Sequence, residues 1–315
     1  MNRRVMILTD SSAYLPTDLV DSYPIRVMPL TLNWDGMSYR DGMDIQAHEF
    51  YQRLSTSTTI PHTSQLTASE LHQNIHSLLE EGYDVLLLPI SSGISSTYLT
   101  AVNEIKTFPK GRVVVMDTKL VSMALGFQVM AAARASVAGS SLAECEQAAR
   151  QAYGNIGVYF TVDTLKYLAA GGRINNAKRL LGSAINIKPI LQIRDGKIEL
   201  VSSVISRRKA IARMLDLVEV GIGGRTPVRI SVLHSLAAEP AGDLLQTAQA
   251  RFSPIDCILS EISPVVGVHV GPGTLAIAYQ AGEEETIPAH DAFGLLKPKQ
   301  MPLTATIETR ETFYA

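Results

Sequence analysis

One histidine and several groups of hydroxyl residues are the side chains of this sequence best suited to chemistry. His269 lies in the stretch VVGVHVGPG, where only Val270 separates it from a Gly-Pro-Gly sequence. An imidazole can donate a hydrogen bond, accept one, or carry charge near neutral pH. The alternative is a histidine whose nitrogens are satisfied by backbone groups in a glycine-rich turn, and the sequence alone leaves both interpretations open.

Hydroxyl side chains gather where several apolar runs end. The groups are Asp10-Ser11-Ser12, Thr63-Ser64-Gln65, the stretch 91–97 and Asp117-Thr118. Helix capping is the ordinary role of such residues, but their concentration also indicates a binding site. Ser95 precedes a segment with helical spacing, so its hydroxyl should lie at a helix N-terminus, where anions are favoured. Thr63, in a stretch that we expect to be irregular, could donate to the same anion.

The first half of the chain must position most of these hydroxyls. Apolar, strand-like runs alternate there with segments of helical spacing, and the runs occupy residues 5–9, 25–34, 83–90 and 112–117. This alternation predicts a parallel sheet with helices on both faces. Ligands of such sheets bind beyond the carboxyl ends of the strands, which is where three of the four hydroxyl groups stand.

The second half is less regular and predicts a mixed sheet. Residues 190–201 read as a hairpin, because Asp195-Gly196 suits a type I′ turn between alternating residues. A helix is expected from Arg207, and His269 is expected at the end of a strand. The length of 315 residues suits two domains. We expect a parallel-sheet α/β domain over 1–154, a smaller mixed-sheet α/β domain over 155–282 and a tail over 283–315.

Composition excludes several classes of protein. With 46% apolar and 18% charged residues and a net charge of −2, the chain shows neither a disordered composition nor a basic field for nucleic acid. Cys145 and Cys257 lack metal-ligand spacing and suit a reducing compartment, so we expect no metal and a cytoplasmic location. No apolar run is long enough to span a membrane. No phosphate-loop or nucleophile-elbow motif is present.

A basic segment follows the first strand of the second half. It carries Arg173, Lys178, Arg179 and Lys188. The segment is either a solvated surface or a patch that meets an acidic or phosphate-bearing partner.

Seven segments in order resemble the DegV family of bacterial fatty-acid-binding proteins. They are TDSSAYLP, PHTSQ, ISSGISSTY, VMDTKLVSMALG, FTVDTLKYLAAGGRI, INIKPIL and GVHVGPG, and they span about residues 3–282. The resemblance implies a two-domain α/β protein with a long narrow pocket between the domains. The pocket would hold one long-chain fatty acid such as palmitate and no cofactor. Several members of the family resemble the acyl-carrier subunit of bacterial fatty acid kinase, whose separate kinase subunit forms the acyl phosphate.

The resemblance also assigns residues. It implies that Thr63 and Ser95 bind the carboxylate, with Ser64 and Ser96 beside them, and that His269 is the pocket histidine. Arg173 of the GGRI segment would dock the kinase subunit. No strong fixed cation stands near these residues in the sequence.

The chain departs from the family pattern at two positions. Leu66 stands where the family usually has proline, and Ser96 stands where it usually has glycine. The Ser96 side chain would narrow the headgroup site or add a hydrogen bond, so it bears on the choice of ligand rather than on its class.

Two further functions remain as alternatives. In a serine hydrolase acting on acyl esters, Ser95 would be the nucleophile and His269 the base, although such a site also needs an orienting carboxylate and an oxyanion hole. In a phosphotransfer subunit, His269 would carry a phosphoryl group.

Overall fold

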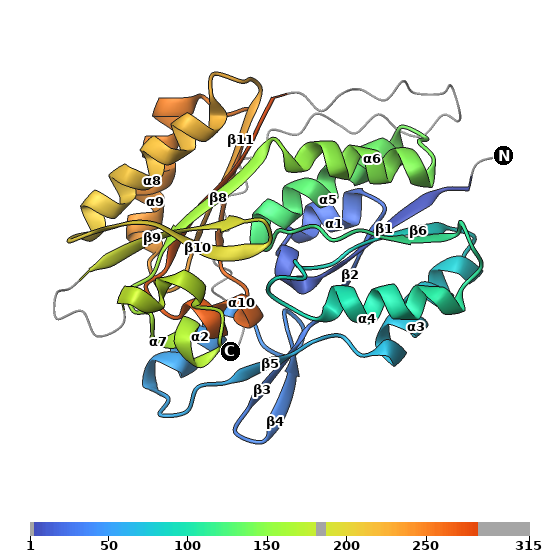
Figure 1. Ribbon diagram of the computed structural model, residues 1–315, viewed down its shortest axis with the longest axis horizontal. Coiled ribbons are helices and arrows are strands. Elements are labelled where there is room, and N and C mark those ends of the chain that lie inside the picture. The colour runs from blue at the N-terminus through green and yellow to red at the C-terminus, as the bar shows by residue number, and fades with distance from the viewer. Residues whose placement is uncertain (1–2, 181–186, 283–315) are drawn as a thin grey trace, which may run out of the picture.

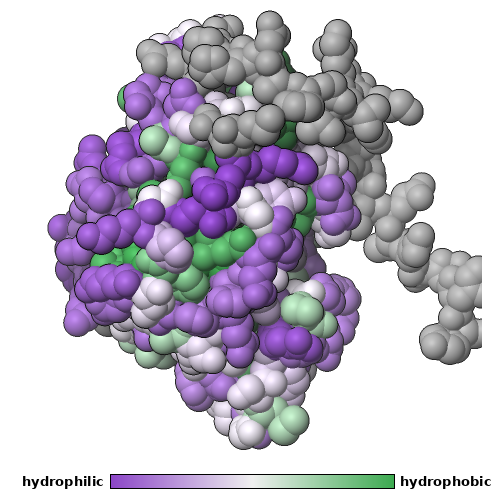
Figure 2. Space-filling view, turned by 90° about the vertical axis from the view of Figure 1, so that its right-hand side faces the viewer, coloured by the Kyte–Doolittle hydropathy of each residue, from purple (hydrophilic) through white to green (hydrophobic). Residues whose placement is uncertain are grey.

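The protein is an α/β structure with two main sheets (Figure 1). A computed structural model describes residues 3–180 and 187–282, so the predicted tail over 283–315 lies outside the described residues. On the face of the molecule shown in Figure 2, hydrophilic residues cover most of the surface that the described residues form. They surround a narrower apolar band.

The first sheet confirms the predicted parallel order. Its four strands run β2-β1-β6-β7, and every neighbouring pair is parallel. Helices lie on both sides of it, with α5 and α6 above and α3 and α4 below in Figure 1. The strands are β1 (Val5–Asp10), β2 (Ile25–Met28), β6 (Asp84–Leu88) and β7 (Val113–Val115). The helices are α1 (Thr17–Ser22), α3 (Ala68–Glu80), α4 (Thr97–Glu104), α5 (Ser122–Val137) and α6 (Leu142–Tyr153).

The second sheet is mixed, as predicted. Its strands run β10-β9-β8-β13-β11-β12, and only the β11–β12 pair is parallel. The strands are β8 (Ile156–Thr161), β9 (Lys188–Arg194), β10 (Lys197–Val204), β11 (Val228–His234), β12 (Asp256–Glu261) and β13 (Leu275–Ala281). The helices of this half are α7 (Lys166–Ala170), α8 (Arg207–Ile222), α9 (Ala238–Phe252) and α10 (Pro264–Val270).

The predicted hairpin is confirmed and brings the two sheets together. Asp195 and Gly196 both have positive φ, 48° and 79°, as a type I′ turn requires. The Ser91 hydroxyl, after β6, donates to the Gly196 carbonyl at 2.8 Å. A Cβ on Gly93 would lie 2.3 Å from the same carbonyl oxygen, so the loop after β6 meets the hairpin tip at a distance that only glycine allows.

One prediction about strands is wrong. The run 25–34 is not one strand, because β2 ends at Met28 and a separate β3 (Thr31–Trp34) begins after Pro29. Proline has no N–H for the ladder, and the next N–H, of Leu30, donates to the Ser11 hydroxyl instead. A small antiparallel sheet of order β4-β3-β5 results, with β4 (Met37–Arg40) and β5 (His62–Ser64). The stretch around Thr63 is therefore a strand and not irregular, and α2 (Ala47–Thr56) precedes it.

The prediction that His269 ends a strand is also wrong. His269 lies in the last turn of the short helix α10, with Pro264 in the first turn and Gly271, at φ 75°, as its cap. Proline suits a first helical turn because the N–H that it lacks has no helical partner there. A short apolar run rich in β-branched residues does not distinguish a strand from a buried helix.

One buried core joins the two main sheets. It contains Ile7 and Leu86 of the parallel sheet together with Phe160 and Ala278 of the mixed sheet. The division into domains at residue 154 therefore stays a prediction, placed between the end of α6 and the start of β8.

Candidate functional site

A cavity of about 180 Å³ lies where the sheets meet, and the residues predicted for the site line it. Its volume is roughly ten times the minimum that one water molecule needs, so it has room for a larger ligand. Six residues predicted from the sequence to act in ligand binding or partner docking line it: Thr63, Ser64, Ser95, Ser96, Arg173 and His269. They come from β5, the loop before α4, the loop after α7 and helix α10.

Thr63 and His269 are in direct contact. The Thr63 Oγ1 lies 3.0 Å from the His269 Nε2, although 206 positions separate the two residues. Side chains alternate along β5, so Thr63 is half-buried while His62 and Ser64 are exposed. The alternation directs the Thr63 hydroxyl toward α10.

The His269 imidazole is held neutral. Burial, and then the positive charge of Arg173, lower its pKa to about 4. Its Nδ1 atom is buried and has no hydrogen-bond partner among the described residues. A Cβ on Gly171 would lie 2.2 Å from that nitrogen, so the backbone after α7 packs directly against the ring. A neutral imidazole carries one N–H and can donate a single hydrogen bond to a ligand oxygen.

Ser95 and Ser96 precede helix α4, which confirms the predicted helix N-terminus. The Ser95 hydroxyl accepts a hydrogen bond from the Thr97 N–H at 3.2 Å and lies 3.0 Å from the Thr97 hydroxyl. Ser96 is the cap residue, is exposed, and makes no capping bond with its side chain. Ser95 thus both accepts the hydrogen bond of the Thr97 N–H and lines the pocket. The free N–H groups of the first turn of α4 favour an anion nearby.

The Ser64 hydroxyl is engaged away from the cluster. It accepts a hydrogen bond from the Asn33 amide at 2.8 Å. Ser64 lines the pocket, but its hydroxyl belongs to the exposed face of the small sheet.

A fixed cation that is distant in sequence lies near the cluster in space, because Arg173 lines the pocket. Its Nε and Nη2 donate to the Ile94 carbonyl at 3.1 and 3.0 Å, and its Nη1 donates to the Gly171 carbonyl at 2.5 Å. The charge is therefore held between the Ser95 loop and the backbone that packs on His269. Ile94 lies 79 positions from Arg173, so no local pattern could reveal this contact.

A buried carboxyl braces the strand ends beneath the pocket. Asp10 accepts hydrogen bonds from the Ile90 N–H at 2.7 Å and from the Ser12 hydroxyl at 2.5 Å, and Ser12 lines the cavity. Burial raises the pKa of the Asp10 carboxyl, against the effect of these bonds. The pattern Asp10-Ser11-Ser12 was visible in the sequence, but its bracing role was not.

The apolar walls are the part of the site that the sequence did not reveal. They include Leu30, Ile90, Ile94, Val121, Val158, Phe160, Ile193, Ile198, Ile262, Val265, Val266, Val270 and Ala276. The mixed sheet supplies several of them, and apolar pocket walls have the composition of ordinary core. The site therefore combines a polar cluster of hydroxyls, imidazole and guanidinium with apolar walls.

A second cavity lies between α1, β2 and the edge strand β12. Its volume is about 500 Å³, and none of the six residues predicted for the site lines it. Asp41 lines it, and burial raises the pKa of this carboxyl to about 7.

Neither a metal centre nor a membrane span is found in the described part of the chain. No three His, Cys, Asp or Glu residues gather there in a group that could hold a metal ion. None of the helices described has both the length and the apolar character needed to cross a membrane.

Comparison with known proteins places the chain in a family. The family model described as "Uncharacterised protein, DegV family" matches residues 4–282. A DegV domain-containing protein of Listeria innocua is 32% identical over 280 residues, which are 89% of this chain and 99% of that protein.

Solved structures agree with this placement. The chain is similar to a fatty-acid-binding DegV family protein of Thermus thermophilus, at 32% identity and a TM-score of 0.83, over 88% of this chain and 99% of that one. It is also similar to DegV of Bacillus subtilis, a fatty acid binding protein, at 27% identity and a TM-score of 0.80, over 89% and 99% of the two chains. The chain belongs to the DegV family.

Proposed function

We propose that this protein binds one long-chain fatty acid in the cavity between the two sheets. Its carboxylate would contact Thr63, Ser95 and His269, and its hydrocarbon chain would lie along the apolar walls. The observation that carries the proposal is that these three residues, from distant parts of the chain, line one cavity whose remaining walls are largely apolar.

The polar cluster suits a carboxylate. On binding, the Thr63 hydroxyl and the neutral His269 imidazole would exchange their mutual hydrogen bond for bonds to the carboxylate, and the Ser95 hydroxyl would donate another. The α4 N-terminus favours negative charge, and Arg173 supplies a fixed positive charge. Each methylene that leaves water contributes roughly 0.8 kcal/mol before the cost of association. The hydrocarbon chain therefore supplies most of the affinity, and the cluster sets the orientation.

The comparisons support the same ligand. The DegV family proteins of Thermus thermophilus and Bacillus subtilis bind fatty acids, and both align with nearly their whole length. Their similarity supports a fatty acid as the ligand class.

The headgroup end of the bound acid would face a partner. Gln65 and Ser96 line the cavity and are exposed, so this end of the pocket opens to solvent. We extend the proposal to a separate fatty acid kinase subunit that phosphorylates the bound carboxyl, with Arg173 at its docking surface.

The hydrolase alternative requires a different hydrogen-bond pattern. The His269 Nε2 is paired with the Thr63 hydroxyl, and the Ser95 hydroxyl is paired with Thr97. No carboxylate orients His269 through Nδ1 among the described residues. A catalytic triad needs a hydrogen bond from the serine to the histidine and another from the histidine to a carboxylate. The geometry therefore favours binding without bond cleavage.

Extraction followed by mass spectrometry tests the proposal. Protein purified from a bacterial host should release about one long-chain fatty acid per chain, and stripped protein should take one up again. Empty protein that takes up no fatty acid would refute the binding function. Turnover of a chromogenic ester that disappears in Ser95→Ala would favour the hydrolase instead.

A further inference from the structure

The turn that follows His269 forms part of the pocket wall. Helix α10 ends at Val270, and the turn 271–273 leads into β13. Val270 and Thr274, on either side of the turn, both line the cavity. The placement of this turn therefore determines where α10 presents the His269 imidazole.

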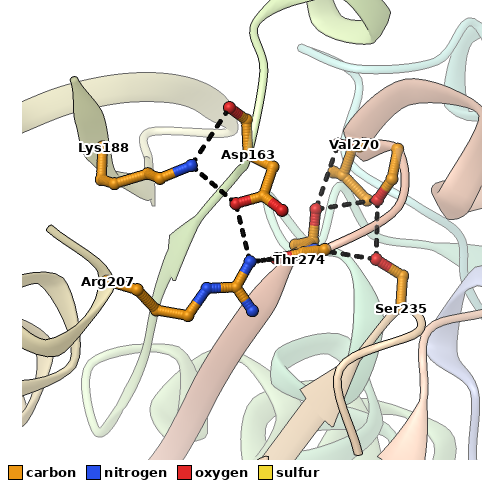
Figure 3. Close-up of polar contacts among 8 residues, drawn as sticks. Asp163, Lys188, Arg207, Ser235, Val270 and Thr274 are labelled. Atoms are coloured by element: carbon orange, nitrogen blue, oxygen red, sulfur yellow. Dashed lines mark hydrogen bonds and ion pairs between the residues drawn. The ribbon is translucent and has the colours of Figure 1, made fainter. Parts of the chain in front are cut away.

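The inner side of the turn is bound by Ser235, which follows β11. Its hydroxyl donates to the Gly271 carbonyl at 2.6 Å and accepts from the Thr274 N–H at 3.0 Å, while its carbonyl accepts from the Gly273 N–H at 2.7 Å. The Thr274 hydroxyl reaches the Val270 carbonyl at 3.0 Å (Figure 3). These bonds connect the turn to the core of the mixed sheet.

The outer side is held by a charged group whose members come from α8, β9 and the loop after β8. Arg207, at the start of α8, donates through one nitrogen to the Gly273 carbonyl at 3.0 Å and to the Asp163 carboxylate at 2.6 Å. Lys188, at the start of β9, donates to the same carboxylate oxygen at 2.8 Å. Figure 3 shows Lys188 and Arg207 converging on Asp163, with the turn beyond it.

Asp163 lies against the turn itself. A Cβ on Gly273, which has φ +80°, would lie 2.0 Å from the Asp163 Oδ2. An arginine side chain loses considerable rotamer entropy when it is fixed. The carboxylate compensates for this loss because it orients the guanidinium that reaches the Gly273 carbonyl.

We propose that Asp163 and Arg207 are positioning residues for the ligand site: by holding the turn after α10, they set the position of His269 against Thr63 and the ligand carboxylate. Neither residue lines the cavity. They therefore act through the turn and not by contact with the ligand. The ligand part of this inference rests on the proposed function, whereas the placement of His269 does not.

The test compares Asp163→Asn and Arg207→Lys with Asp216→Asn. Asp216 is a matched control, because it lies on α8, the helix that begins with Arg207, and its carboxylate accepts a hydrogen bond from Arg251 of α9 in an exposed ion pair. Two properties of stripped protein are measured: the His269 imidazole resonances through a pH titration, and the affinities for hexadecanoate and for hexadecan-1-ol. The alcohol has the same hydrocarbon chain but no carboxylate.

In Asp163→Asn the His269 pKa should rise by about one unit, because a displaced ring is less completely buried. The affinity for hexadecanoate should fall about tenfold, since small misplacements of a binding group are costly, while the affinity for the alcohol changes less than about threefold. Arg207→Lys should give values between those of wild type and Asp163→Asn, because position 207 keeps a cation, and Asp216→Asn should match wild type. If Asp163→Asn does not fold, Arg207→Lys still tests the inference.

The inference would be overturned if Asp163→Asn and Arg207→Lys had the same His269 resonances, and the same ratio of acid to alcohol affinity, as Asp216→Asn. Equal losses of affinity for the acid and the alcohol would also overturn it. Failure of the proposed function is distinguishable. In that case the wild type binds neither ligand, and the His269 titration alone decides whether Asp163 positions the ring.

Discussion

The Thr63 hydroxyl lies 3.0 Å from the Nε2 of His269. The two residues belong to different halves of the chain, so no local sequence pattern predicts their contact. Burial and the Arg173 charge keep the imidazole neutral, so the contact is a hydrogen bond between two uncharged groups. Arg173 provides the positive charge of the cluster, and its own side chain is fixed by two backbone carbonyls.

Removal of the Thr63 hydroxyl should weaken carboxylate binding. Thr63→Val keeps the shape of the side chain but removes a donor, and a hydrogen bond to a charged group contributes about 1.5–3 kcal/mol. The affinity for hexadecanoate should therefore fall at least about tenfold in a calorimetric titration. Ser64→Ala is the matched control, because its hydroxyl bonds Asn33, and it should stay within about twofold of wild type. Equal effects of the two substitutions would argue against a specific role for Thr63.

The neutral His269 predicts a pH-dependent contribution to stability. A histidine whose pKa is lowered to about 4 when folded binds fewer protons than the unfolded chain, where its pKa is about 6.5. Its contribution is complete above about pH 6.5 and is lost as the pH falls toward 4, by at most about 3 kcal/mol. Urea unfolding at about pH 7 and pH 5 should show a larger loss for wild type than for His269→Gln.

The comparison with His269→Gln isolates this group. Asp41, with its pKa raised to about 7, changes stability in the opposite direction over the same range and is present in both proteins. Parallel stability curves for wild type and variant would show that His269 is not neutral and buried in the folded protein.

Gly171 should tolerate no side chain. A Cβ there would lie 2.2 Å from the His269 Nδ1, so Gly171→Ala must displace the imidazole or the backbone after α7. We expect a fall in hexadecanoate affinity of about tenfold or more. Gly242→Ala, in helix α9 with open space around it, is the control and should stabilise the protein by about 0.5–1 kcal/mol. Full ligand affinity in Gly171→Ala would contradict the packing of the ring.

The mixed-sheet wall should control the length of the ligand. Ala276 lines the cavity and pairs with Phe160 across β13 and β8, so Ala276→Leu places additional volume in the apolar part of the pocket. The affinity for hexadecanoate should fall more than that for decanoate, which needs less space. Measurement of both acids separates loss of volume from loss of folding, since an unfolded variant loses both equally.

Local patterns were sufficient for most of the elements and for the polar residues of the site, but not for the contacts between distant segments. The parallel sheet followed from buried runs such as 83–90, and the hairpin from Asp195-Gly196. Helix α10 was mistaken for a strand because Val265, Val266 and Val268 suit either structure. Arg173 could not be placed, since its partner Ile94 is distant in sequence.

A crystal structure of the protein with hexadecanoate decides whether the polar cluster binds the carboxylate. We expect density for one acyl chain in the cavity between the sheets, with its carboxylate oxygens within hydrogen-bond distance of Thr63, Ser95 and His269. An acyl chain in the second cavity beside Asp41, or one whose carboxylate points away from His269, would contradict it.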